Sequence, residues 1–97
     1  MKVRLRGEAY ADLTGIQSWV SEKSPRAARE IIDRILLELE RLGHFPLLGH
    51  AGRVRDTREW IVPRLPYIIV YRIGASADEL VVIGVFHAAQ DRDNKKR

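Results

Sequence analysis

The chain has 97 residues, of which 45% are apolar and 31% are charged, and its formal net charge is +4. This composition is typical of one small globular domain spanning residues 1–97 and excludes a disordered polyelectrolyte. Cysteine is absent, which excludes a disulfide scaffold, a thiolate metal site and a cysteine nucleophile. Because neither a signal peptide nor an apolar run long enough to span a bilayer is seen, we expect a cytoplasmic protein without a membrane partner.

The N-terminal half predicts a strand followed by two helices. Residues 2–6 alternate between apolar and basic side chains, as in a short strand with one buried face. Apolar residues then recur at helical spacing over about 8–22 and again over about 25–42. Ser24 and Pro25 are typical of a helix start, because serine caps free N–H groups and proline needs no hydrogen-bond acceptor there. The short connection predicts an antiparallel helical hairpin.

The C-terminal half predicts a loop followed by three strands. Residues 43–54 are rich in glycine and form the expected loop. Runs of β-branched and aromatic residues predict strands at 58–62, 67–73 and 80–86, with short connections that favour antiparallel hairpins. A polar tail follows at about 91–97. The predicted fold is α+β with the order β-α-α-β-β-β, in which the helical hairpin packs on one face of an antiparallel sheet.

The last two predicted strands are apolar on both faces, although two helices can cover only one face of a sheet. In the final strand, strict alternation would place Leu80, Val82 and Phe86 on one face of the sheet and Val81, Ile83 and Val85 on the other face. The second apolar face therefore predicts a second cover. This cover is either a partner chain that lays a helix or strand there, or a chain end or the 43–54 loop of this protein.

Positive charge is concentrated in the second half, where residues 50–97 hold nine basic and six acidic side chains. Seven of the nine are arginines, whose planar forks match phosphate and carboxylate geometry. The charge indicates either a polyanionic partner, such as nucleic acid or an acidic protein segment, or a solvated basic surface.

Several sequence runs resemble the RelE/ParE superfamily of toxins, which belong to type II toxin–antitoxin modules. In the C-terminal half these runs are TREW at 57–60, PYIIVYR at 66–72 and VFHAAQ at 85–90. AYADL at 9–13, SPRAA at 24–28, and Pro46 followed by Gly49 are similar to the same superfamily. The resemblance covers about residues 3–90 and implies a compact toxin of β-α-α-β-β-β order.

The resemblance also implies a cognate antitoxin, whose extended acidic tail wraps the toxin. Such a partner would account for the basic C-terminal half and for the second apolar face, which we expect to stay open until the antitoxin binds. Trp60, Ile68 and Val70 are the expected antitoxin contacts. Operator DNA would be bound mainly through the antitoxin, and no cofactor or metal is expected.

Members of the superfamily differ in mechanism. RelE-like toxins cut mRNA on the ribosome, whereas ParE-like toxins poison DNA gyrase and have no hydrolytic site. Metal-free RNA cleavage needs a base, an acid and cations near the phosphate. The expected catalytic residues are His87, Arg58 and Arg72, and the expected nucleic-acid or target contacts are Arg53, Arg55 and Arg64.

This set of residues is chemically sufficient and slightly favours a ribosome-dependent mRNA endonuclease. A ParE-like gyrase poison and a degenerate toxin that only binds are the alternatives, since Ala88 stands where some ribonuclease members carry a tyrosine. Two of these residues could instead have a purely structural role. Arg58 could form an ion pair with Glu59, and His87 could be a hydrogen-bonded histidine that closes the sheet.

Overall fold

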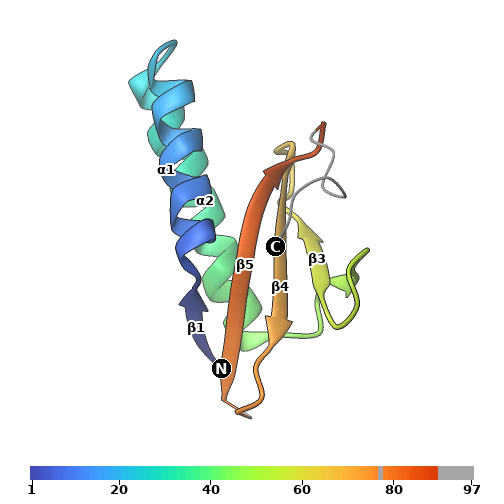
Figure 1. Ribbon diagram of the computed structural model, residues 1–97. Coiled ribbons are helices and arrows are strands. Elements are labelled where there is room, and N and C mark those ends of the chain that lie inside the picture. The colour runs from blue at the N-terminus through green and yellow to red at the C-terminus, as the bar shows by residue number, and fades with distance from the viewer. Residues whose placement is uncertain (77, 90–97) are drawn as a thin grey trace.

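The computed structural model describes residues 1–76 and 78–89 and has the predicted α+β architecture (Figure 1). Its elements in chain order are β1 (Lys2–Leu5), α1 (Gly7–Ser21), α2 (Pro25–His44), β2 (His50–Ala51), β3 (Arg58–Ile61), β4 (Tyr67–Ile73) and β5 (Glu79–His87). The polar tail expected at 91–97 lies outside the described residues. The two helices and the strands β3, β4 and β5 confirm the elements predicted from periodicity.

The helices form a hairpin that lies against one face of the sheet (Figure 1). As predicted, α2 begins after Ser24, whose Oγ accepts a hydrogen bond from the Ala27 N–H at 3.1 Å, and Pro25 is its first residue. The helix continues to His44, two residues past the expected end. In the described part of the chain, neither helix combines the length and the apolar content that crossing a membrane requires.

The sheet has the order β1-β5-β4-β3-β2. The predicted antiparallel pairing of β3 with β4 and of β4 with β5 is confirmed, but β1 runs parallel to β5, with Leu5 opposite Val82. The sheet is therefore mixed, and the prediction of a wholly antiparallel sheet is wrong for this edge. The helical hairpin separates β1 from the other strands, and a crossover of this length allows parallel pairing. The short β2 lies in the predicted 43–54 loop and pairs with β3.

A bulge interrupts the pairing of β4 with β5. Val70 lies opposite Gly84 and the next residue, Tyr71, lies opposite Val82, so that Ile83 is an extra residue in β5. An extra residue shifts the alternation of side chains by one position in the rest of the strand. Strict alternation therefore cannot hold along the whole of β5.

The bulge corrects the predicted faces of β5. Leu80 and Val82 belong to the main core between the helices and the sheet, and Val85 joins them there. Phe86 lies with Ile83 in a second cluster on the other face. The prediction that groups Phe86 with Leu80 and Val82 is wrong, because it assumed an uninterrupted strand.

The second apolar cluster consists of Ile68, Val70, Ile83 and Phe86. Each of these residues is at most 7% exposed. The sheet is apolar on both faces, as predicted, but the expectation that the second face stays open until a partner binds is wrong for this chain. Within the cluster, Ile68 lies directly opposite Phe86 in the pairing of β4 with β5.

Candidate functional site

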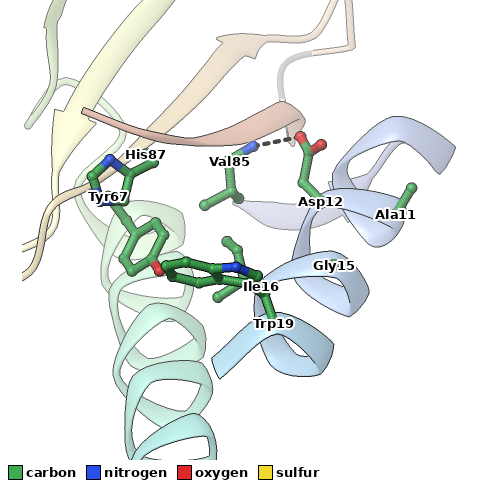
Figure 2. A pocket seen from close by; sticks show the side chains of 8 residues that line it. All are labelled: Ala11, Asp12, Gly15, Ile16, Trp19, Tyr67, Val85 and His87. Carbon is green, nitrogen blue, oxygen red and sulfur yellow. Dashed lines mark hydrogen bonds between the residues drawn. The ribbon is translucent and has the colours of Figure 1, made fainter. Parts of the chain in front are cut away.

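A groove of about 460 Å³ lies between α1 and the C-terminal end of β5 (Figure 2). It is lined by Ala11, Asp12, Gly15, Ile16, Trp19, Tyr67, Val85 and His87. The groove exists because β1 pairs with β5 only as far as Val82. Within the described part of the chain, α1 and not a strand lies beside the remaining residues of β5.

Asp12 connects the two walls of this groove. Its Oδ2 accepts a hydrogen bond from the backbone N–H of Val85 at 2.9 Å (Figure 2). This N–H lies on the edge of β5 beyond Val82, where β1 no longer pairs with it. The carboxylate therefore takes the place of a strand acceptor. The neighbouring Gly84 has no room for a side chain, because a Cβ there would lie 2.9 Å from Asp12 Oδ2. The contact therefore fixes the distance between α1 and β5.

Aromatic side chains from two elements face each other across the groove (Figure 2). Trp19 on α1 is 58% exposed, and Lys23 Nζ lies 4.8 Å from the centroid of its ring. Tyr67 at the start of β4 is only 4% exposed. Burial raises the pKa of Tyr67 above its ordinary value, so its hydroxyl is neutral at physiological pH. The groove thus has an apolar body with a neutral phenol in its wall.

His87 lies at the mouth of the groove, at the end of β5. Its Nδ1 accepts a hydrogen bond from the Ala89 N–H at 3.0 Å, which places the proton of the neutral ring on Nε2. Its ring meets Tyr67 edge to face, with centroids 5.4 Å apart and planes at 86°. These contacts match the alternative in which His87 is a hydrogen-bonded histidine that closes the sheet.

Arg58 is directed toward the segment between α2 and β2. Its Nη2 donates to the backbone oxygens of Leu47 at 3.1 Å and Gly49 at 2.6 Å. Glu59 projects from the other face of β3, with an oxygen 3.9 Å from His50 Nε2. Arg58 therefore binds carbonyl groups and not Glu59, because successive residues of a strand point to opposite faces.

The structure does not bring the three expected catalytic residues together. His87 is paired with Tyr67, and Arg72 lies five residues further along β4, which corresponds to roughly 17 Å along the strand. Arg58 lies opposite Tyr71, so it occupies the other face of the sheet from Arg72. The register therefore places the three residues at different points of the sheet, with Arg72 on the opposite face from Arg58.

The other expected contact residues also fall into separate places. Arg53 and Arg55 are exposed on the connection between β2 and β3, whereas Arg64 is exposed in the turn after β3, at the opposite end of that strand. These three arginines therefore do not form a single basic stripe.

The expected antitoxin contacts lie on two faces of the sheet. Trp60 is on the helix side, where its Nε1 donates to Glu38 Oε1 at 2.7 Å. Ile68 and Val70 are buried in the second cluster on the other face. The role of Asp12 was not predicted, because a side chain that accepts one hydrogen bond from a strand 73 residues away has no characteristic spacing in the sequence.

Comparison with known sequences identifies the family. Residues 3–92 match the model of the ParE toxin of the parDE type II toxin–antitoxin system. The chain is 32% identical over 89 residues to toxin Y4kP of Sinorhizobium fredii, covering 92% of this chain and 90% of the relative. It is also 32% identical over 83 residues to toxin RelE2 of Caulobacter vibrioides, covering 84% of this chain and 89% of that protein.

Comparison with solved structures agrees with this fold. The chain superposes on a chain of the chromosomal ParDE system from P. aeruginosa with a TM-score of 0.78 at 20% identity, covering 90% of this chain and 95% of the other. It matches a chain of the RelBE2 toxin–antitoxin complex from Mycobacterium tuberculosis with a TM-score of 0.57 at 25% identity, covering 89% and 95%. The chain therefore belongs to the ParE toxin family of type II toxin–antitoxin systems.

Proposed function

We propose that the free chain arrests bacterial growth by binding DNA gyrase, in the manner of ParE-like toxins, and cuts no RNA. The observation that carries this proposal is the separation of His87 from Arg58 and Arg72. His87 pairs with Tyr67, whereas Arg58 lies opposite Tyr71, four residues further along β4.

RNA cleavage without a metal needs the proton-transfer group and the stabilising cation at the same phosphate. A general base must lie within about 3 Å of its proton or reach it through one water. The strand register separates His87 from Arg72 by several times that distance. Arg58 already donates to the carbonyls of Leu47 and Gly49. The arrangement is therefore better suited to presenting a surface than to hydrolysis.

The antitoxin is the second part of the proposal. Two solved relatives belong to ParDE and RelBE2 toxin–antitoxin systems, and this chain has a net charge of +4. A cognate antitoxin with an acidic segment would bind such a surface, and operator DNA would be bound only through the resulting complex. We place this complex in the cytoplasm, where gyrase acts.

Ribosome-dependent mRNA cleavage is the second candidate function. The relative named toxin RelE2 supports it, because RelE-like members of the superfamily cut mRNA. In that case His87 would act as the acid or base, and Arg58 or Arg72 would move to the phosphate when the ribosome binds. The two candidates give opposite results with a His87→Ala variant.

A translating cell-free extract separates the two functions. Purified chain and the His87→Ala variant are added, and the message is mapped by primer extension. The proposal predicts an intact message with both proteins and equal growth arrest when either is induced in a bacterial host. Message cleaved by the wild type and spared by His87→Ala would overturn the proposal in favour of the endonuclease.

A further inference from the structure

The Tyr67 hydroxyl is a polar group that the described part of the fold leaves without a hydrogen bond. Tyr67 is 4% exposed, and its hydroxyl points toward Trp19 in the groove beside α1 (Figure 2). Among the residues that the structure describes, none donates to this hydroxyl or accepts from it. Burial raises the pKa of Tyr67, so the oxygen keeps its proton and remains a donor. A buried tyrosine hydroxyl usually has a partner, and here a partner would have to come from the groove.

The groove beside this hydroxyl has an open floor on α1. Gly15 lies in the lining, and a Cβ built on it would meet no atom within 4 Å. Ala11 also lines the groove and lies one turn earlier on the same helix. The volume of about 460 Å³ is within the range of roughly 300–1,000 Å³ that is typical of small-molecule sites. The groove therefore has room for a small ligand beside Tyr67.

The edge of β5 in the groove does not favour an extended peptide. A strand added at this edge would bind the outward N–H of Val85. This N–H already donates to Asp12 Oδ2 at 2.9 Å. A ligand of the groove is therefore recognised by side chains and not by strand pairing.

Aromatic rings determine the shape of ligand that the groove favours. Trp19 is 58% exposed, and the Lys23 ammonium lies 4.8 Å from the centroid of its ring. Lys23 is not among the lining residues, so this ammonium contacts the ring without filling the groove. Tyr67 and His87 add two further rings, whose centroids are 5.4 Å apart. Aromatic rings gain more from stacking or edge contact with another flat ring than from burial alone, so the lining favours a planar ligand.

The charges of the lining favour a neutral ligand. Neither lysine nor arginine lines the groove, so an anionic ligand would lose its water without an opposite charge. Asp12 is the one carboxylate of the lining and would repel an anion further. A cation would be attracted by Asp12 but repelled by the Lys23 ammonium at Trp19. A neutral ring with an oxygen acceptor for the Tyr67 hydroxyl loses least on leaving water.

We infer that the groove between α1 and β5 is a binding site for a small, neutral, planar aromatic ligand whose carbonyl oxygen accepts a hydrogen bond from Tyr67. The ring lies against Trp19 and over Gly15. The Tyr67 hydroxyl then gains the partner that the described residues do not supply. This site is independent of the proposed function, because it requires neither gyrase binding nor RNA cleavage.

Three probes of similar size test the ligand class by NMR titration of the isotope-labelled chain. Benzamide is flat and neutral and carries a carbonyl, benzoate is the matched anion, and cyclohexanecarboxamide is the matched amide without a flat ring. We expect benzamide to shift the amide signals of Gly15 and Val85 and the indole N–H signal of Trp19. The other two probes should bind about tenfold more weakly or less.

Gly15→Leu fills the floor of the groove, and Gly7→Leu is its matched control. Gly7 begins the same helix and its Cβ position also meets no atom within 4 Å, but it does not line the groove. Benzamide binding should be lost in Gly15→Leu and unchanged in Gly7→Leu. Tyr67→Phe should weaken binding about tenfold, because the carbonyl loses its donor. Trp19→Ala should weaken it similarly at an exposed position that the fold does not need, and circular dichroism checks that all four variants are folded.

The comparison of probes and variants decides the inference. Benzamide shifts that Gly15→Leu abolishes, and that benzoate does not reproduce, would support the site. If millimolar benzamide causes no shifts in the wild type, the groove holds only water and the inference is overturned. Equal affinities for benzamide and benzoate, or equal benzamide binding by the wild type and Tyr67→Phe, would also overturn it. A chain that leaves gyrase active would remove the proposed function without changing this comparison.

Discussion

The Asp12 carboxylate accepts a hydrogen bond from the Val85 N–H at 2.9 Å, two residues after the bulged Ile83. This contact joins the middle of α1 to the part of β5 that β1 does not reach. It satisfies a strand-edge donor without another strand, and it shapes the groove that contains Trp19 and Tyr67.

Replacing Asp12 with alanine should destabilise the fold, because the Val85 N–H would lose its acceptor. The expected loss in free energy of unfolding is about 1–3 kcal/mol, measured by urea denaturation. Asp12→Asn is the matched control, since it keeps an oxygen acceptor and should lose less. An alanine variant as stable as the wild type would show that water replaces the carboxylate.

The space around two glycines predicts opposite effects of an alanine substitution. A Cβ at Gly84 would lie 2.9 Å from both Asp12 Oδ2 and the Phe86 ring, so Gly84→Ala should destabilise the chain by about 1–3 kcal/mol. Gly15 in α1 has no atom within 4 Å of its Cβ position, so Gly15→Ala should stabilise the helix by about 0.5–1 kcal/mol. Thermal unfolding of both variants checks the sign, and a Gly84→Ala protein as stable as the wild type would contradict the close packing at this position.

Local patterns were enough to predict the helices and most of the strands. Apolar spacing and the Ser24–Pro25 start define α2, and the interaction of Ser24 with the Ala27 N–H confirms the cap. The bulge at Ile83 could not be predicted, because β5 is apolar on both faces and shows no alternation to break. The parallel pairing of β1 also depends on residues at opposite ends of the chain, for which sequence patterns give no register.

Tyr71→Phe, with Tyr67→Phe as its matched control, tests the hydrogen bonds that hold the backbone of residues 46–49. Tyr71→Phe removes both the donor to Pro46 O and the acceptor of the Gly49 N–H. Two buried groups lose their partner, so the expected loss is about 2–4 kcal/mol. Tyr67→Phe should lose less near neutral pH, since the Tyr67 hydroxyl points toward Trp19 in the groove (Figure 2) and not toward residues 46–49. Equal losses in the two variants, measured by urea denaturation, would contradict a stabilising role for the two hydrogen bonds of the Tyr71 hydroxyl.

Tyr67 should also make stability depend on alkaline pH. Burial raises the pKa of Tyr67 above its ordinary value of 10.0, so the folded chain holds the phenol proton more tightly than the unfolded chain. The stability that results is fully present below pH 10.0 and is lost as the pH rises through the raised pKa. The free energy of unfolding should therefore fall more steeply above that pH in the wild type than in Tyr67→Phe. If the free energy of unfolding falls equally steeply with pH in both proteins, burial does not raise the pKa of Tyr67.

The site was less predictable than the fold, for a physical reason. His87, Arg58 and Arg72 were chosen by residue type, but their positions depend on strand register and on which face each side chain occupies. Arg58 shows the difficulty most clearly, because its partners are backbone oxygens of Leu47 and Gly49 that no side-chain motif records.

Inhibition of DNA gyrase tests the central claim most directly. Relaxed plasmid, gyrase and ATP are incubated with increasing amounts of the purified chain, or of the His87→Ala variant, and supercoiling is followed on agarose gels. The account predicts that both proteins stop supercoiling at similar concentrations, because binding and not proton transfer by His87 inhibits the enzyme. Normal supercoiling in the presence of a large excess of the chain would contradict it.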